Sequence, residues 1–154
     1  MKIRLVAVGK ISESWLKQGV AEYSQRLSKY CKLEIIEVAD QPDHIPMAQR
    51  LSKEAKAIES VLSGRGKVVL LDLHGVQRSS EQFAAEFARW QVQGTSEITF
   101  VIAGSSGFDP DFCARQRERW CLSELTFTHQ MTRLLLLEQL YRAFKINNNE
   151  KYHK

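Results

Sequence analysis

Short apolar runs alternate with longer segments of helical composition from one end of this chain to the other. Two of the runs, Lys67–Leu73 and Ile98–Ala103, are almost entirely apolar, as strands are when helices cover both faces of a sheet. Alternation of this kind predicts an α/β fold with a mainly parallel sheet flanked by helices. The five expected strands occupy residues 2–9, 33–38, 67–73, 98–103 and 121–127.

Capping side chains mark where several of the intervening helices begin. Ser12 precedes a segment with apolar residues at helical spacing, and Ser79 with Gln82 has the spacing of a capping box. Asp109 before Pro110 predicts the start of a short helix, because proline fits the first helical position. Two longer helices are expected at residues 47–62 and 130–146, the second apolar on almost every side.

The composition is that of a globular protein with a small positive charge. Lys and Arg (22) outnumber Asp and Glu (18), and the resulting net charge of +4 favours a polyanionic partner only weakly. No apolar stretch approaches the roughly 20 residues of a membrane span. The three cysteines lack CxxC spacing, which favours reduced thiols in the cytosol, and the four histidines lack metal-ligand spacing, so no metal is expected. Without repeats or a break in composition, residues 1–154 are expected to form one domain.

Three turns follow expected strands, and ligands of parallel sheets bind at the carboxyl ends of the strands. The turns are Gly9–Lys10, Leu73–Gly75 and Gly104–Gly107, and the last two follow the most apolar strands. We expect those two to form the rim of a ligand site. Gly104–Gly107 alone is weak evidence, since it lacks the lysine of a P-loop and the spacing of GxGxxG.

Charged residues on the last helix require partners if that helix is buried. His129 and Arg133 share a face, and Glu138 and Arg142 are spaced for an intrahelical ion pair. A lone histidine such as His129 is more often a helix-start residue bonded to backbone than a catalytic base. These residues therefore indicate either a site, an oligomer interface or ordinary helix chemistry.

Five segments of the chain read KIRLVAVGK, KVVLLDLHG, IAGSSGF, LSELTFTHQMTRLLLLEQLYRAFKI and KYHK. Together they resemble the RlmH family of small SPOUT-class methyltransferases, which act on bacterial large-subunit ribosomal RNA. The resemblance covers the whole chain, and its C-terminal part is the most specific.

The resemblance implies a homodimer whose C-terminal third is threaded into a trefoil knot, with S-adenosylmethionine held in a bent pose by three loops. Carried onto this sequence, the cofactor-binding residues are Leu71, Asp72 and Leu73, then Ala103, Gly104, Ser105 and Gly107, then Leu122, Ser123, Glu124, Leu125, Thr126, Phe127 and Thr128.

The resemblance also implies the product, N3-methylpseudouridine in the loop of helix 69 of 23S ribosomal RNA, made on the assembled ribosome in the cytoplasm. Tyr152 and His153 would complete the active site across the dimer and handle the N3 proton or orient the base. Arg133 or Arg142 would stabilise charge on the uracil carbonyls. The residues expected to hold RNA phosphates are Lys145, Lys151 and Lys154.

This chain departs from the family pattern at two loop positions. The family usually has Gly-Gly where this chain has Ala103 and Gly104, and proline where it has Thr128. Ala103 is compatible with the loop if its φ is negative, whereas Thr128 lacks proline's rigidity. Two other functions stay open: a catalytically idle module that binds RNA or the ribosome on the same fold, and a knotted methyltransferase that acts on another RNA.

Overall fold

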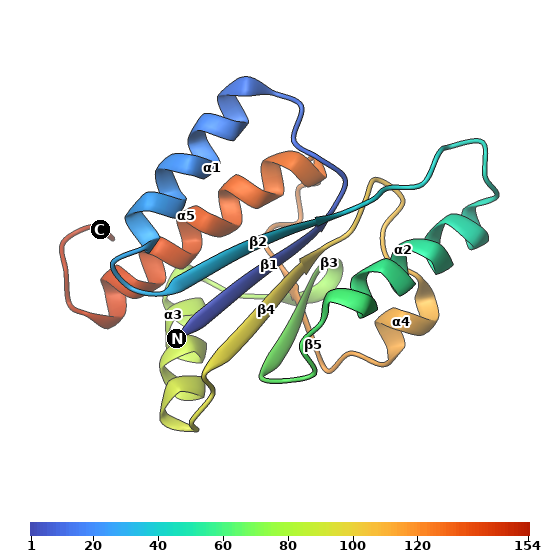
Figure 1. The fold of residues 1–154 in the computed structure, drawn as a ribbon. Coiled ribbons are helices and arrows are strands. Elements are labelled where there is room, and N and C mark those ends of the chain that lie inside the picture. Colours follow the sequence, from blue (N-terminus) through green and yellow to red (C-terminus); the bar gives the residue numbers. More distant parts are fainter.

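The computed structural model describes all 154 residues and contains one five-stranded sheet (Figure 1). Every pair of neighbouring strands is parallel, and the strand order is β2-β1-β4-β3-β5. The strands are β1 (Lys2–Val8), β2 (Lys32–Val38), β3 (Lys67–Gln77), β4 (Glu97–Ile102) and β5 (Glu118–Cys121). The predicted α/β class with a parallel sheet is confirmed.

Helices cover both faces of the sheet (Figure 1). Side chains alternate between the faces along a strand, so Ile3 and Leu5 of β1 join one core cluster while Val6 and Val8 join another. The helices on the first face are α1 (Ser14–Leu27), α3 (Ser80–Val92) and α5 (His129–Asn147), and those on the second are α2 (Met47–Val61) and α4 (Pro110–Ala114).

Two of the three expected helix caps are present. The Ser79 side chain accepts a hydrogen bond from the Gln82 N–H and the Gln82 side chain accepts one from the Ser79 N–H, which completes the capping box. Asp109 caps α4. The prediction for Ser12 is wrong, because α1 begins at Ser14 without a side-chain cap. Ser12 instead binds the Gln130 side chain on α5.

The expected fifth strand is also wrong. Strand β5 ends at Cys121, where the prediction begins, and the following residues up to α5 form a loop. The reason is that β3 is the only neighbour of β5, and the last residue of β3, Gln77, pairs with Cys121. Beyond that point the chain has no strand to pair with, whatever its β propensity.

Strand β3 extends four residues beyond its predicted end at Leu73 and contains a bulge. The register of the β3–β5 pair shifts between Leu71 and Val76, so the intervening residues bow out of the ladder. Gly75 lies there because a Cβ at this position would sit 2.6 Å from the backbone of Arg119.

No helix is both long and apolar enough to span a membrane. The knot and the single-domain assignment stay predictions.

Candidate active site

Of the three segments predicted to bind a cofactor, the first lies at the bulge within β3, and the other two follow the carboxyl ends of β4 and β5. In the sheet, β3 lies between β4 and β5. Leu71 of β3 pairs with Ile102, the last residue of β4, so the bulge and the second loop begin side by side. The third loop leads into α5, whose first residue, His129, lies near Gly9 at the end of β1. We call this edge the rim, and define it by residues 71–75, 103–107 and 122–128.

The Gly104–Gly107 turn has the backbone conformation that its glycines allow. The Gly107 N–H donates to the Gly104 carbonyl oxygen (3.1 Å), and Gly107 has a φ of +80°. A Cβ on Gly104 would lie 3.3 Å from Val8 and 3.6 Å from the Glu54 carboxylate. Ala103 is not among the residues with positive φ, so the condition for tolerating alanine there is met.

The carboxylate of Asp72 is occupied by neighbours within the protein. Arg119 donates to Asp72 Oδ2 through Nε (3.0 Å) and Nη2 (2.6 Å), the His74 N–H donates to Oδ1, and the Cys113 thiol lies 3.6 Å away. Burial raises the pKa of Asp72, but the Arg119 guanidinium and the His74 N–H outweigh burial and lower it overall. Asp72 and Arg119 therefore fasten the bulge of β3 to β5.

Apolar side chains project from the rim into solvent. Leu73 is 54% exposed, Leu125 is 70% exposed and Phe127 is 38% exposed. Large apolar side chains exposed together indicate a binding surface more strongly than scattered ones. The loop that carries two of them is held by the Ser123 hydroxyl, which accepts from the Leu125 N–H (3.0 Å).

Thr128 keeps the conformation that proline would impose. Its φ is −60°, the value to which a proline ring restricts the backbone, and its hydroxyl accepts from the Met131 N–H as the cap of α5. The departure from the family pattern is therefore compensated locally. The next residue, His129, has its pKa lowered by burial and by the nearby charge of Arg133.

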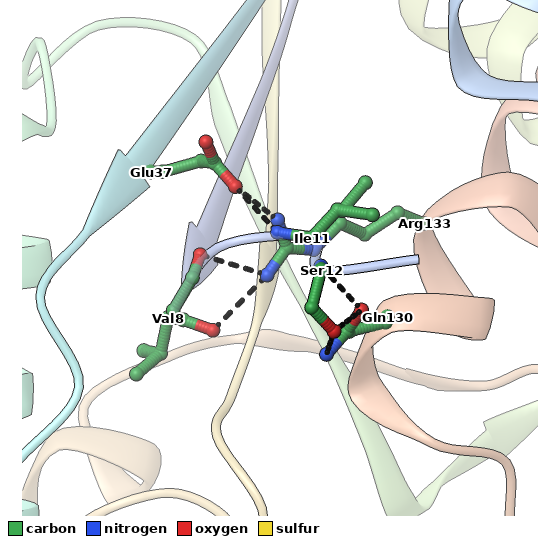
Figure 2. A network of polar contacts seen from close by, with 7 residues as sticks. Val8, Ile11, Ser12, Glu37, Gln130 and Arg133 are labelled. Carbon is green, nitrogen blue, oxygen red and sulfur yellow. Dashed lines mark hydrogen bonds and ion pairs between the residues drawn. The ribbon is translucent and has the colours of Figure 1, made fainter. Parts of the chain in front are cut away.

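Arg133 is buried and joins α5 to the ends of β1 and β2 (Figure 2). Its Nη2 donates to the carbonyl oxygens of Val8 (3.1 Å) and Gly9 (2.9 Å), and its Nη1 pairs with Glu37 (2.6 Å). Nearby, Gln130 binds Ser12. With 1% of its surface exposed, Arg133 is placed to hold the fold together, not to contact RNA.

Tyr152 and Arg142 converge on one carboxylate at the other end of α5. Glu138 Oε1 pairs with Arg142 Nη2 (2.5 Å) and accepts from the Tyr152 hydroxyl (3.1 Å), which also contacts Tyr23 on α1. Burial, with the Tyr23 and Glu138 contacts, raises the pKa of Tyr152. The intrahelical Glu138–Arg142 pair expected from the sequence is present and also holds the C-terminal segment.

His153 is bonded at both ring nitrogens. Nε2 lies 2.7 Å from Glu81 Oε1 on α3, and Nδ1 lies 3.2 Å from Arg142 Nη1. A guanidinium can only donate hydrogen bonds, so Arg142 Nη1–H donates to His153 Nδ1. The ring hydrogen of His153 is therefore on Nε2, which donates to the Glu81 carboxylate. We call residues 151–154 the tail, and the residues that hold it, Tyr23, Glu81, Glu138 and Arg142, its cradle. Sequence reasoning missed Glu81, which is 72 residues from His153.

The predicted RNA-binding lysines differ in availability. Lys145 pairs with Glu150 and lies over the rings of Tyr30 and Tyr141, whereas Lys151 and Lys154 are exposed. The hydrogen bond to Glu150 raises the pKa of Lys145. Lys145 is thus engaged within the protein, and the two tail lysines are the accessible cations.

The rim and the tail lie far apart within one chain. Arg142, which contacts His153, lies 13 residues beyond His129 on α5, or about 20 Å along the helix axis. Figure 1 shows the C-terminus at one side of the molecule, away from the loops at the carboxyl ends of the strands. The structure thus brings the three loops together and the tail residues together, but it does not bring the two groups to each other.

A groove of ≈ 710 Å³ lies outside the rim. It lies between α1 and the amino end of β2, where Tyr30 and Leu33 line it, and none of the predicted site residues borders it. No cluster of three or more potential metal ligands occurs in the structure.

The fold is shared with a solved structure of a probable methylase family protein from Haemophilus influenzae Rd KW20. The match has a TM-score of 0.53 at 16% identity and covers 99% of this chain and 70% of the other. At this identity the likeness concerns the fold alone.

Sequence comparison gives the family. Residues 1–153 match the model of a family described as predicted SPOUT methyltransferase, and the chain belongs to that family. Curated relatives named ribosomal RNA large subunit methyltransferase H are 46% identical in Acetivibrio thermocellus and 43% identical in Latilactobacillus sakei, with both chains fully covered. A relative from Clostridium perfringens with the same name and the suffix 1 is 45% identical. The resemblance to the RlmH family is thereby confirmed.

Proposed function

We propose that this protein is a homodimeric, S-adenosylmethionine-dependent methyltransferase of large-subunit ribosomal RNA in the cytoplasm. Its product would be N3-methylpseudouridine in the loop of helix 69, made on the assembled ribosome. Full-length relatives with 43–46% identity carry the name of a large-subunit ribosomal RNA methyltransferase. The observation that carries the proposal is the meeting of the three family cofactor loops at one edge of the sheet.

The residues of the rim fit an adenosine-containing cofactor. Leu73, Leu125 and Phe127 offer exposed apolar surface of the kind that surrounds an adenine ring, and the Gly104–Gly107 turn offers backbone groups without bulky side chains. S-adenosylmethionine supplies a methyl group on a sulfonium sulfur, ready for in-line displacement. The rim residues position that group, and positioning accounts for much of the acceleration of such a transfer.

Transfer to N3 forms a carbon–nitrogen bond, breaks the carbon–sulfur bond and releases the N3 proton. In the proposal, Tyr152 and His153 orient the base and receive or relay that proton, and Arg142 stabilises negative charge on the uracil carbonyls. Arg133 takes no part in the chemistry because its side chain is buried and bonded to Val8 and Gly9.

A second copy of the chain would supply the tail. One chain separates His153 from the rim by most of the length of α5, so a tail acting on the same chain would have to leave its cradle. An antiparallel arrangement of two copies lets the docked tail of one face the rim of the other. Lys151 and Lys154 of the docked tail would then reach phosphates of the bound RNA.

The test is methyl transfer from radiolabelled S-adenosylmethionine to ribosomes that lack the modification. Assembled ribosomes, free 23S ribosomal RNA and transfer RNA are compared, and the product nucleoside is identified by mass spectrometry. We expect labelled N3-methylpseudouridine in helix 69 from ribosomes alone. Ribosome binding without transfer would identify an idle module, and transfer to another RNA would identify a different substrate; either result contradicts the proposal.

A further inference from the structure

Glu54 is the one buried acidic side chain of this protein. It projects from the middle of α2 and is 8% exposed. The two buried arginines, Arg4 and Arg133, each have a carboxylate partner within 4 Å. Glu54 has no ion-pair partner, although an unpaired buried charge is costly.

The hydrogen bonds of Glu54 account for only one of its two oxygens. Oε1 accepts from the Gln41 N–H at 3.2 Å, and no protein donor binds Oε2. Arg50, one turn earlier on α2, is paired with Asp43. Burial raises the pKa of Glu54, against the opposing effects of the Gln41 N–H and the Arg50 charge.

The free oxygen faces the rim. Oε2 lies 3.6 Å from the point where a Cβ on Gly104 would stand, which is van der Waals contact with that turn. Glu54 also borders the same closely packed spot as Ala103 and Gly107 of the turn. A carboxylate without a cation therefore stands beside the turn that is proposed to hold a cationic cofactor.

We propose that the Glu54 carboxylate binds a positive charge in the methionine part of S-adenosylmethionine. This inference rests on the proposed function and adds a residue to it from outside the three family loops. The positive group is the sulfonium or the α-ammonium, and either meets the need of Glu54 for a counter-charge. Binding of the cofactor would pair the only buried acid that the free protein leaves without a cation.

Glu54→Gln separates the charge of this side chain from its structural role. The amide oxygen of glutamine still accepts from the Gln41 N–H, so the contact between α2 and the preceding loop is kept. Glu59→Gln is the matched control, because Glu59 lies five residues further along α2, where it pairs with Arg115 at the surface. Thermal unfolding followed by circular dichroism verifies that both variants fold.

Calorimetric titration with three ligands tests the proposal on the intact protein. S-adenosylmethionine carries both positive groups, S-adenosylhomocysteine carries only the ammonium, and 5′-methylthioadenosine carries neither. We expect Glu54→Gln to weaken S-adenosylmethionine at least about tenfold, with methylthioadenosine unchanged and Glu59→Gln like wild type. An equal loss for S-adenosylhomocysteine identifies the ammonium as the partner, and an unchanged affinity identifies the sulfonium.

Two results would overturn the assignment. S-adenosylmethionine affinity of Glu54→Gln within about twofold of wild type would show that the charge is not used. An equal loss for all three ligands would show that the substitution only deforms the rim. If the wild-type protein does not bind S-adenosylmethionine, the proposed function itself is refuted, together with this assignment. That outcome differs from the two above, in which the wild-type protein binds the cofactor.

Discussion

The two ends of helix α5 carry arginines with opposite surroundings. Arg133, near the amino end, is 1% exposed and fixed by two backbone carbonyls and Glu37. Arg142, nine residues later, is partly exposed and holds Glu138 and the tail residue His153. Both are cations on one helix, yet the first is part of the fold and the second belongs to a surface where the chain ends.

The difference shows that a charged residue on a largely apolar helix can either stabilise the fold or remain accessible to a substrate. The buried guanidinium of Arg133 is inaccessible to a substrate, and its bonds to two carbonyls and a carboxylate fix the ends of β1 and β2. Arg142 instead bonds to Glu138 and to His153 and is partly exposed, so a substrate can reach it. The proposed function accordingly places methyl transfer at the carboxyl end of α5 and cofactor binding at the loops near its amino end.

Replacing Arg133 with methionine should have the largest effect on stability. Removal of one partner from a buried hydrogen-bonded cluster leaves the carbonyls of Val8 and Gly9 unpaired and should cost about 3 kcal/mol. Urea unfolding measures this loss. Arg142→Met is the control and should cost under about 1 kcal/mol, because its ion pair is partly exposed. A stable Arg133→Met protein without turnover would reverse the comparison and make Arg133 catalytic.

Replacing His153 with alanine should affect turnover without affecting the cofactor. Loss of a group that handles a proton in the transition state typically lowers the rate about 100-fold or more. Single-turnover methyl transfer measures the rate, and calorimetry should give an unchanged S-adenosylmethionine affinity. His44→Ala, in an exposed turn, is the matched control. Unchanged turnover of His153→Ala would remove the tail from the mechanism.

Arg119→Met should weaken cofactor binding at the rim and leave the tail unaffected. Arg119 holds Asp72 beside the bulge of β3, and its side chain is 36% exposed, so the loss should be about 1 kcal/mol, or roughly fivefold in S-adenosylmethionine affinity. Arg115→Met, which breaks a surface pair with Glu59, is the control. If Arg119→Met binds the cofactor as wild type does, Asp72 does not position the rim.

Glu81→Gln should have the smallest effect, and one that depends on pH. The hydrogen bond from His153 lowers the pKa of Glu81 to about 2 from its ordinary 4.5. Since the unfolded chain binds the proton more readily, the stabilisation by ionised Glu81 is complete above about 4.5 and disappears as the pH falls through about 2. Wild type should therefore unfold less readily than Glu81→Gln at pH 7, with the difference disappearing at pH 2. A difference independent of pH would exclude the His153 contact as its cause.

The apolar runs were sufficient to predict the parallel sheet, because strands such as Ile98–Ala103 can be buried in few other ways. The error at Cys121 arose because the end of a strand depends on its neighbour, and Gln77 of β3 offers no further partner. Local caps such as Ser79 were predictable since both partners lie within four residues.

The candidate site was harder to predict from the sequence than the fold, because its contacts join distant parts of the chain. The need of Arg133 for a partner follows from its place on an apolar helix, but Glu37 is 96 residues away. Arg119 and Asp72 are 47 residues apart, and Glu54 meets the Gly104 turn only after α2 packs on the sheet. No periodicity records such pairs. The turns at Leu73–Gly75 and Gly104–Gly107 were predicted from the parallel sheet, whereas the third loop and the tail were located through the family resemblance.

The central claim is that one active site combines the rim of one chain with the tail of another, and mixed dimers test it most directly. Leu73→Arg places a charge on the exposed rim and should abolish cofactor binding, whereas His153→Ala disables only the tail. Each variant alone should be nearly inactive. A dimer with one chain of each kind keeps one intact rim facing one intact tail.

The two variants are exchanged at equal concentration, mass spectrometry verifies the mixed dimers, and methyl transfer to ribosomes is measured. Random exchange puts half of the dimers in the mixed form with one working site of two, so the account predicts recovery of about a quarter of wild-type activity. Mixed dimers that remain as inactive as their parents would contradict it, because each rim would then require the tail of its own chain.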